Sequence, residues 1–168
     1  MNNLTKYFIL LILFIASHFS QAQTAEHKLY DPSANAENDI TASIKKAQQE
    51  NKHVLLQVGG NWCKWCIEFN RFCKADAQID SILNADFIVY HLNYSKENKN
   101  EKLLAQYGFP QRFGFPVFII LDENGNRIHT QNSSYLEEKQ SYSKDKVFEF
   151  LKQWNRKSIS PQTYQNKK

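Results

Sequence analysis

Two of the three cysteines in this sequence, Cys63 and Cys66, are separated by only two residues, in the segment Trp-Cys-Lys-Trp-Cys. The apolar, β-branched stretch at 53–58 precedes them and predicts a buried strand. Gly-Gly-Asn at 59–61 breaks that strand, and an amphipathic stretch then predicts a helix from Cys63 to about Lys74. The sequence therefore places both cysteines where a strand turns directly into a helix.

The start of a helix changes the chemistry of a cysteine that lies there. Backbone N–H groups at this end carry partial positive charge, which favours a thiolate over a thiol at Cys63. Cys66 would lie one helical turn farther on, close enough to form a small disulfide ring with Cys63. Such a pair can accept or donate two electrons by thiol–disulfide exchange.

The N-terminus has the features of a segment that is removed on export. Lys6 provides a short basic region, residues 7–16 form an unbroken apolar run, and Ser-Gln-Ala at 20–22 places small residues at a cleavage site. The run is about ten residues long, half of what a membrane span requires. We therefore expect a cleaved signal peptide at 1–22, with an uncleaved membrane anchor as the alternative. No cysteine lies near the expected cut, which argues against a lipoprotein.

Charge and cysteine content narrow the class of function. The net charge is +4 at pH 7 and the basic residues are not clustered, except at the last two positions. This pattern does not support binding of nucleic acid or of a membrane surface. Disulfides persist outside the cytosol, but three cysteines cannot form a purely structural framework, and a three-residue spacing constrains little of the chain. A reactive pair and one remaining thiol fit this composition better.

The rest of the chain alternates helices and strands. The length of 168 residues suits one domain, which we expect at 39–156, after an extended lead-in at 23–38 and before a frayed tail at 157–168. The predicted helices lie at 39–51, with Asp39 as N-cap and the end near Asn51, and at 63–74, 77–84, 101–107 and 143–154. The predicted strands lie at 53–58, 87–93 (buried), 117–121 and 127–130, with a turn at 122–126 between the last two. In the last helix, one face carries Val147, Phe148, Leu151 and Trp154. This order predicts an α/β domain with a mixed sheet covered by helices on both faces.

From about Ile40 to Trp154 the chain resembles the thioredoxin superfamily. Three features carry the resemblance in order: the Trp-Cys-x-x-Cys junction, Gly-Phe-Pro at 114–116 before a buried strand, and the Asp-Glu-Asn-Gly hairpin at 122–125. The Gly-Gly-Asn lead and residues 142–154 are similar to the secreted bacterial thioredoxin-like branch. The resemblance implies a thioredoxin-like fold, with a central mixed β-sheet flanked by helices on both faces.

The resemblance also implies roles for individual residues. Cys63 would be the exposed attacking thiolate and Cys66 the buried resolving cysteine, and the two would form the redox disulfide. Pro116 would be a cis-proline beside that disulfide, with Phe115 offering backbone groups to an extended substrate. Trp62 would form the apolar rim on which a client peptide rests.

The two residues between the cysteines differ from the Gly-Pro of reducing thioredoxins. Lys64 is expected to stabilise the Cys63 thiolate, since a nearby cation lowers the pKa of a thiol. A stabilised thiolate favours the reduced form and makes the disulfide more oxidising. Trp65 cannot be wholly buried at this position and is expected to influence the choice of partner.

A second departure concerns the proton of the resolving thiol. Thioredoxins usually carry a buried carboxylate six residues before the first cysteine, where this chain has Gln57. In place of the lysine on the neighbouring strand, His91 precedes the Leu-Asn pair at 92–93. We hypothesise that Gln57 and His91 replace the acid–lysine pair, with neutral His91 relaying the proton directly or through water. The alternative is a hydrogen-bonded core histidine.

Three further features have alternative interpretations. Cys73 is expected to be a buried inert thiol, with a redox role as the minor alternative. Zinc bound by Cys63 and Cys66, with Cys73 or a histidine, is a competing interpretation, but the chain has no second Cys-x-x-Cys and no His-x-x-x-His pair, so we expect no metal. The aromatic loop at 109–113 could line a client groove or cover the edge of the sheet.

The function favoured by the sequence is that of an exported thiol–disulfide oxidoreductase acting on cysteines of other extracytoplasmic proteins. We expect no cofactor, a monomer in the bacterial periplasm, an unidentified redox partner, and no nucleic-acid partner or stable membrane insertion. Whether it reduces, oxidises or isomerises depends on the reduction potential of the Cys63–Cys66 couple. The competing class is a redox-silent binding module that presents Trp62, Trp65 and the loop at 109–113 to a protein partner.

Overall fold

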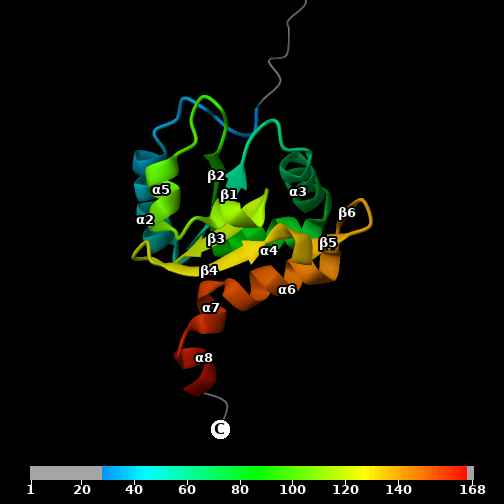
Figure 1. The fold of residues 1–168 in the computed structure, drawn as a ribbon. Coiled ribbons are helices and arrows are strands. Elements are labelled where there is room, and N and C mark those ends of the chain that lie inside the picture. The colour runs from blue at the N-terminus through cyan, green and yellow to red at the C-terminus, as the bar shows by residue number, and fades with distance from the viewer. Residues whose placement is uncertain (1–27, 166–168) are drawn as a thin grey trace, which may run out of the picture.

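A computed structural model describes residues 28–165 (Figure 1). The expected signal peptide at 1–22, the first part of the lead-in and residues 166–168 lie outside the described residues. The described helices are α2 (Ala36–Glu50), α3 (Lys64–Ala75), α4 (Ala77–Asp86), α5 (Glu101–Gln106), α6 (Lys144–Trp154), α7 (Arg156–Ile159) and α8 (Gln162–Gln165), with 3-10 turns η2 (Pro110–Phe113) and η3 (Ser133–Leu136). The strands are β1 (His53–Gly59), β2 (Phe87–Asn93), β3 (Val117–Leu121), β4 (Arg127–Asn132), β5 (Glu137–Glu138) and β6 (Ser141–Tyr142).

The main sheet has four strands in the order β2-β1-β3-β4. Strands β1 and β2 are parallel, whereas β3 pairs antiparallel with both β1 and β4. Helices α2 and α5 pack on one face, and α3, α4 and α6 pack on the other (Figure 1). This arrangement confirms the expected α/β class, a mixed sheet with helices on both faces.

Strand β1 lies at the centre of the sheet, and all seven of its residues are buried. Its side chains alternate between the two faces, because successive residues of a strand point in opposite directions. Val54, Leu56 and Val58 pack toward α2 and α5, whereas Leu55 packs toward α3. Gln57 follows the same alternation and therefore faces α3, the helix that carries the two cysteines.

Strand β2 corrects one prediction. The sequence predicts a buried strand at 87–93, but β2 is an edge strand and four of its seven residues are not buried. Val89 in its middle is exposed. The apolar run at 87–93 is typical of a buried strand, and only the pairing order reveals that no strand covers its outer edge among residues 28–165.

The start of α2 is also different from the prediction. Asn35, not Asp39, is the N-cap residue, and its side chain accepts a hydrogen bond from the backbone N–H of Asn38 at 3.1 Å. Asp39 lies in the first turn, where a negative charge is favourable, and accepts a hydrogen bond from the Tyr90 hydroxyl at 3.1 Å. The folded unit therefore begins before residue 39, within the segment expected to be an extended lead-in.

Helix α6 presents a slightly different face to the sheet than predicted. Val147, Phe150 and Leu151 are buried, while Phe148 and Trp154 are only partly buried. A hydrogen bond connects the end of this helix to β1: the buried ring of His53, the first residue of β1, donates from Nδ1 to the backbone oxygen of Trp154 at 2.8 Å. Where the sequence predicts a frayed tail, the short helices α7 and α8 follow without any buried residue.

Candidate active site

Cys63 and Cys66 lie at the junction between β1 and α3 and are joined by a disulfide, with Cα atoms 5.2 Å apart. Cys63 is the N-cap residue of α3, and its Sγ accepts a hydrogen bond from the backbone N–H of Cys66 at 3.1 Å. The sulfur of Cys63 thus occupies the positively polarised end of the helix. After reduction the same N–H group would stabilise a thiolate at this atom.

The two cysteines differ in access to solvent. Cys66 is completely buried, whereas Cys63 is 5% exposed. The expectation of an exposed Cys63 is therefore wrong in extent, because Tyr30 and the partly buried Leu29, Trp65 and Phe115 pack around the disulfide. Cys63 is nevertheless the more accessible of the two cysteines, because Cys66 has no exposed surface that an approaching sulfur could reach.

Tyr30 is the site residue that the sequence analysis missed. It lies in the predicted lead-in, yet it is completely buried against Cys63 and Cys66. The side chain of Asn61 holds it there: Asn61 Oδ1 accepts from the Tyr30 N–H at 3.0 Å, and Asn61 Nδ2 donates to the Tyr30 carbonyl at 2.7 Å. The Leu-Tyr pair at 29–30 in an otherwise polar segment is the only signal in the sequence that indicates burial.

The two glycines before the cysteines leave room for these contacts. A Cβ atom on Gly59 would lie less than 3 Å from both the Cys66 Sγ and the Tyr30 Oη. A Cβ atom on Gly60 would meet the Trp62 ring and the backbone oxygen of Tyr94 equally closely. The Gly-Gly-Asn lead is therefore explained by close packing behind and beside the disulfide.

Trp62 forms an aromatic rim beside Cys63, as the resemblance implies. Its side chain is 57% exposed, and its Nε1 donates to the backbone oxygen of Tyr94 at 2.7 Å. The Trp62 ring also meets the Phe115 ring edge-on at 5.3 Å. The Phe115–Pro116 peptide bond is cis, and Pro116 is buried at the start of β3. The roles of these residues in substrate binding remain predictions.

The residues between the cysteines lie in different environments. Lys64 is exposed on the first turn of α3, and its expected effect on the Cys63 thiol stays a prediction. Trp65 is partly buried and meets the Tyr142 ring edge-on at 5.4 Å. The Tyr142 hydroxyl donates to the backbone oxygen of Trp65 at 3.1 Å. Part of the Trp65 surface is therefore used for internal packing rather than for a partner.

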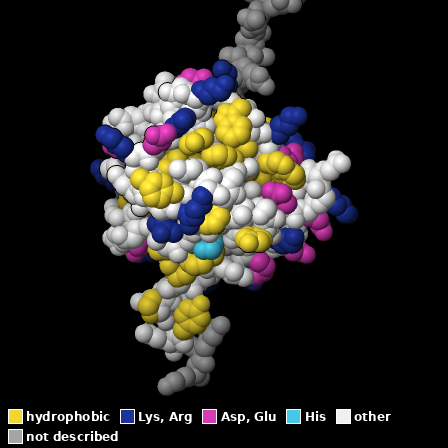
Figure 2. Space-filling view, viewed as in Figure 1, with side chains coloured by type: hydrophobic (Ala, Val, Ile, Leu, Met, Phe, Trp, Pro, Cys, Tyr) yellow, Lys and Arg dark blue, Asp and Glu magenta, His cyan; other side chains and the backbone are white. Residues whose placement is uncertain are grey.

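The aromatic loop at 109–113 exposes its rings. Phe109 and Phe113 are both exposed, and the guanidinium of Arg112 lies 4.1 Å from the centre of the Phe113 ring. Hydrophobic side chains are visible across the face of the molecule drawn in Figure 2. Rings exposed in this way support a role in lining a client groove more than a role in covering the sheet edge.

Gln57 and His91 lie behind the disulfide on neighbouring strands, paired in the register of β1 and β2. The buried Gln57 amide donates to the backbone oxygen of Cys66 at 2.9 Å. The His91 ring packs edge-on against Tyr30, with centroids 5.5 Å apart. In the part of the chain that the structure describes, no hydrogen bond joins His91 to Gln57 or to either cysteine, so the proton relay through His91 has no direct path and stays a hypothesis.

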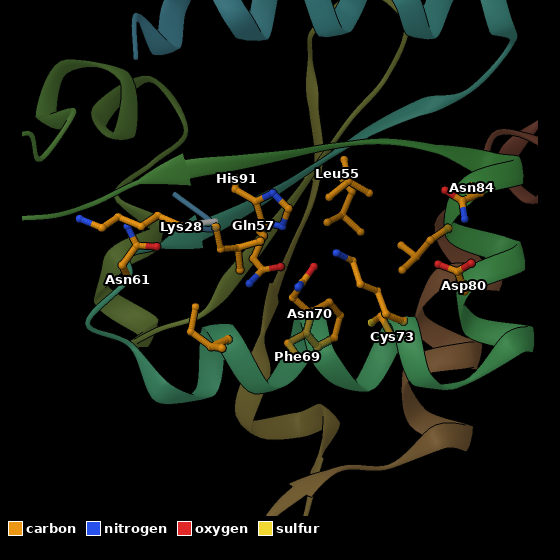
Figure 3. Close-up of a pocket in the computed structure, with 15 residues that line it drawn as sticks. Lys28, Leu55, Gln57, Asn61, Phe69, Asn70, Cys73, Asp80, Asn84 and His91 are labelled. Carbon is orange, nitrogen blue, oxygen red and sulfur yellow. The ribbon is translucent and has the colours of Figure 1, made fainter. Parts of the chain in front are cut away.

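A cavity of about 770 Å³ opens next to this pair, between the sheet and helices α3 and α4. Figure 3 shows the Gln57 and His91 side chains on the side of the sheet that faces α3, with Phe69 and Asn70 on that helix opposite Gln57. Polar and apolar side chains both line the cavity. Its volume is large enough to hold water next to Gln57 and His91, as a water-mediated relay would require.

His91 should make stability depend on pH. Burial, together with the charge of Lys74, lowers the pKa of His91 to about 4, so the folded state holds this ring neutral. The unfolded chain binds a proton here near its ordinary pKa of about 6.5. The stabilisation, roughly 3 kcal/mol, is therefore complete above pH 6.5 and is lost as the pH falls toward 4. Urea unfolding between pH 4 and pH 7 measures this change, which His91→Gln should largely remove.

Burial also lowers the pKa of His129, so this second histidine contributes in the same direction. The difference between wild type and His91→Gln gives the part that is due to His91, and His129→Gln is the matched control, which should remove a smaller part of the pH dependence. An unchanged pH dependence in His91→Gln would contradict the buried, neutral state of this ring.

Cys73 is a free cysteine buried on the inner face of α3. Burial, with smaller effects of Asp80 and Asp76, raises the pKa of its thiol to about 12. Such a thiol carries almost no thiolate at neutral pH, which supports the interpretation as an inert core residue. Residues 28–165 contain no cluster of three or more His, Cys, Asp or Glu side chains that could hold a metal ion.

Comparison with known proteins places this geometry in a family. The thioredoxin-like domain family matches residues 40–143. The chain is 24% identical over 139 residues to the thiol:disulfide interchange protein DsbD of Colwellia psychrerythraea, a match that covers 74% of this chain and 22% of that protein. The match to DsbD of Haemophilus ducreyi is 27% identical over 85 residues and covers 50% of this chain and 14% of that protein. The chain therefore spans less than a quarter of the length of these curated relatives.

Two solved structures share the fold. A disulphide isomerase from Xylella fastidiosa superposes with a TM-score of 0.65 at 21% identity, covering 74% of this chain and 94% of that chain. The oxidised C-terminal domain of DsbD from Neisseria meningitidis gives a TM-score of 0.52 at 19% identity, covering 73% and 97%. These likenesses confirm the thioredoxin-like fold. With the family match extending over more than half of its length, the chain belongs to the thioredoxin-like domain family of the thioredoxin superfamily, and its Cys-x-x-Cys pair lies at the start of α3 as a closed disulfide.

Proposed function

We propose that this protein is an exported thiol–disulfide oxidoreductase that exchanges disulfides with extracytoplasmic proteins through Cys63 and Cys66. One observation carries the proposal. The Cys63 sulfur lies at the start of α3, where it accepts the N–H of Cys66, and Cys63 has the only exposed surface of the pair. A sulfur in this position is both stabilised as a thiolate and within reach of another sulfur.

The reaction needs only cysteine sulfurs and protons. In the reduced protein the Cys63 thiolate attacks one sulfur of a client disulfide, and the second client sulfur leaves as a thiolate that takes up a proton. Cys66 then loses its proton and attacks the Cys63 sulfur of the mixed disulfide, which releases the first client sulfur as a thiolate and closes the Cys63–Cys66 bond. The client has gained two electrons, and the same steps in reverse oxidise a client dithiol.

The surface around Cys63 suits an extended client segment. Trp62 and the aromatic loop at 109–113 provide exposed apolar surface, and the backbone of Phe115 beside cis-Pro116 would pair with the client chain. Lys64, exposed next to Cys63, would add positive charge at the reacting sulfur. Together these residues would hold the client disulfide against the edge of Cys63 while Cys66 stays covered.

The proposed location rests on the sequence. A signal peptide at 1–22 would direct the chain out of the cytosol, and we propose the periplasm as its destination, with the folded domain acting as a monomer on protein thiols and on a redox partner. DsbD proteins are thiol:disulfide interchange proteins by name, which supports the same class of reaction here. Within residues 28–165, no helix has the length and apolar character needed to cross a membrane.

Reduction of insulin disulfides by dithiothreitol tests the proposal. The wild-type protein should accelerate this reaction, and Cys63→Ser should abolish the acceleration because it removes the attacking sulfur. Cys73→Ala is the matched control, since it also removes one cysteine but leaves the Cys63–Cys66 pair intact. Equal rates for wild type and Cys63→Ser would leave the redox-silent binding module as the function.

A further inference from the structure

Tyr30 brings a hydroxyl group to the buried side of the disulfide from outside the sheet and α3. Its backbone N–H and carbonyl both bond to the Asn61 side chain, directly before the Trp-Cys-x-x-Cys segment. Its ring packs against Cys63 and Cys66, and the residue has no exposed surface. Tyr30 is therefore held in place by its backbone, so that its side chain lies at a defined position next to the reacting atoms.

The Tyr30 hydroxyl is close to the Cys66 sulfur. Both atoms lie less than 3 Å from the point that a Cβ atom on Gly59 would occupy, so the Tyr30 hydroxyl and the Cys66 sulfur border the same small space beside Gly59. Among residues 28–165 the hydroxyl nevertheless has no hydrogen-bond partner. The Gln57 amide is near enough to affect the hydroxyl but does not make a hydrogen bond of acceptable geometry with it.

An unpaired buried hydroxyl is unusual, because a buried polar group without a partner destabilises the fold. In the oxidised state the neighbouring Cys66 sulfur is part of a disulfide and is a weak acceptor. Reduction turns the same atom into a thiol or thiolate, and a thiolate is a strong acceptor of a hydrogen bond from a neutral donor. The missing partner of Tyr30 would therefore be created by the reaction itself.

We propose that the Tyr30 hydroxyl donates a hydrogen bond to the Cys66 sulfur in the reduced protein and stabilises the thiolate that resolves the mixed disulfide. This inference rests on the proposed function, because it assigns a role in the second half of that reaction. Tyr30 keeps its own proton: burial raises the pKa of its hydroxyl well above the usual range. When Cys66 attacks, its proton therefore leaves to water or to the departing client thiolate, and Tyr30 stabilises the charge that remains.

This role explains how the chain manages with Gln57 in place of the buried carboxylate. A carboxylate would accept the proton of the resolving thiol, whereas a tyrosine hydroxyl lowers the free energy of the thiolate without accepting a proton. Gln57 cannot take a proton, and its amide N–H already bonds to the backbone oxygen of Cys66. Among the hydrophobic and aromatic side chains of residues 28–165 that pack against Cys63 and Cys66, Tyr30 alone carries a hydroxyl group.

The test compares the equilibrium of each variant with a glutathione redox buffer. In Tyr30→Phe the ring remains and only the hydroxyl is lost, so the reduced form loses its hydrogen bond. In a buffer alkaline enough to ionise the reduced Cys66, where its sulfur is a thiolate, we expect the equilibrium between dithiol and disulfide to shift toward the disulfide by about tenfold, which corresponds to a reduction potential about 30 mV more negative. Tyr107→Phe is the matched control, because Tyr107 is also buried but belongs to the core between the sheet and α2, and it should leave the equilibrium unchanged.

Thermal unfolding in both redox states provides a readout that a merely structural role would not produce. Tyr30→Phe should leave the melting temperature of the oxidised protein unchanged or higher, since it removes an unpaired polar group, and should lower that of the reduced protein. Tyr107→Phe should move both states in the same direction. Asn61→Ala, which removes the two bonds to the Tyr30 backbone, should shift the redox equilibrium in the same direction as Tyr30→Phe.

The outcomes separate the two proposals. A Tyr30→Phe equilibrium within twofold of wild type, or equal effects on the oxidised and reduced melting temperatures, would overturn the role of Tyr30 while exchange through Cys63 and Cys66 stands. If the wild-type pair does not equilibrate with glutathione at all, the proposed function fails and the role of Tyr30 fails with it.

Discussion

Cys66→Ser is expected to trap the client on Cys63 as a stable mixed disulfide. The variant keeps the Cys63 sulfur at the start of α3, where the backbone N–H of residue 66 still points at it. A serine hydroxyl at position 66 cannot displace the client sulfur, so the reaction stops after its first step. Turnover should fall by on the order of 10²-fold or more, as for loss of a reacting nucleophile. Non-reducing gel electrophoresis after incubation with a disulfide-bonded client should show a complex that dithiothreitol dissolves.

The reciprocal variant is the control for this experiment. Cys63→Ser should form almost no complex, because the remaining Cys66 is completely buried. Peptide mapping of the Cys66→Ser complex should place the bond on Cys63, since Cys73 is buried and its burial raises the pKa of its thiol. A complex formed through Cys66 in Cys63→Ser, and none in Cys66→Ser, would reverse the two roles.

Gly59→Ala is expected to destabilise the oxidised protein, although it adds only a methyl group and alanine is normally the better strand residue. In a strand, alanine is normally favoured over glycine by roughly 0.5–1 kcal/mol. Here the new Cβ atom would overlap the Cys66 Sγ and the Tyr30 Oη, and overpacking of this kind costs about 1–3 kcal/mol. The overlap outweighs the backbone gain, so the free energy of unfolding should fall by about 1 kcal/mol, measured by urea denaturation of the oxidised form.

The double variant Gly59→Ala with Tyr30→Phe identifies the cause. Removing the Tyr30 hydroxyl relieves one of the two overlaps, so the double variant should be less destabilised than the sum of the single variants. Changes at residues that touch usually couple by 0.5 kcal/mol or more in either direction. Strict additivity would show that the hydroxyl and the Gly59 backbone are not in contact.

Most of the fold could be predicted because its signals are local. The strand at 53–58, the cysteine-bearing helix and the hairpin after 117–121 each depend on a periodicity or turn within a few residues. The errors concern features that depend on tertiary contacts. The sequence of β2 does not reveal that it lies at the edge of the sheet, and Asp39 fits an N-cap as well as Asn35 until the Tyr90 hydroxyl is seen to bind it.

In the candidate site, too, residues within local motifs could be predicted, whereas residues brought in by tertiary contacts could not. Cys63, Cys66 and Trp62 are adjacent in sequence, and Phe115 and Pro116 have a motif of their own, so sequence patterns indicate all of them. Tyr30 reaches Asn61 across 31 residues, and Tyr142 reaches the Trp65 carbonyl across 77. Tyr30 lies in no motif, and the segment that begins at Tyr142 does not indicate a contact with Trp65. Contacts of this kind could not be predicted from spacing, and they determine how the Cys-x-x-Cys segment is packed.

The pH dependence of alkylation of the reduced protein, resolved by cysteine with mass spectrometry, shows whether the start of α3 stabilises a Cys63 thiolate. A thiolate stabilised by the start of α3 should make Cys63 react with iodoacetamide with an apparent pKa well below 8.5, the ordinary value of a free cysteine. The buried thiol of Cys73 should stay unmodified in the same sample and serve as the internal reference. A Cys63 that titrates near 8.5, or that reacts no faster than Cys73, would show that the start of α3 does not activate this sulfur for exchange.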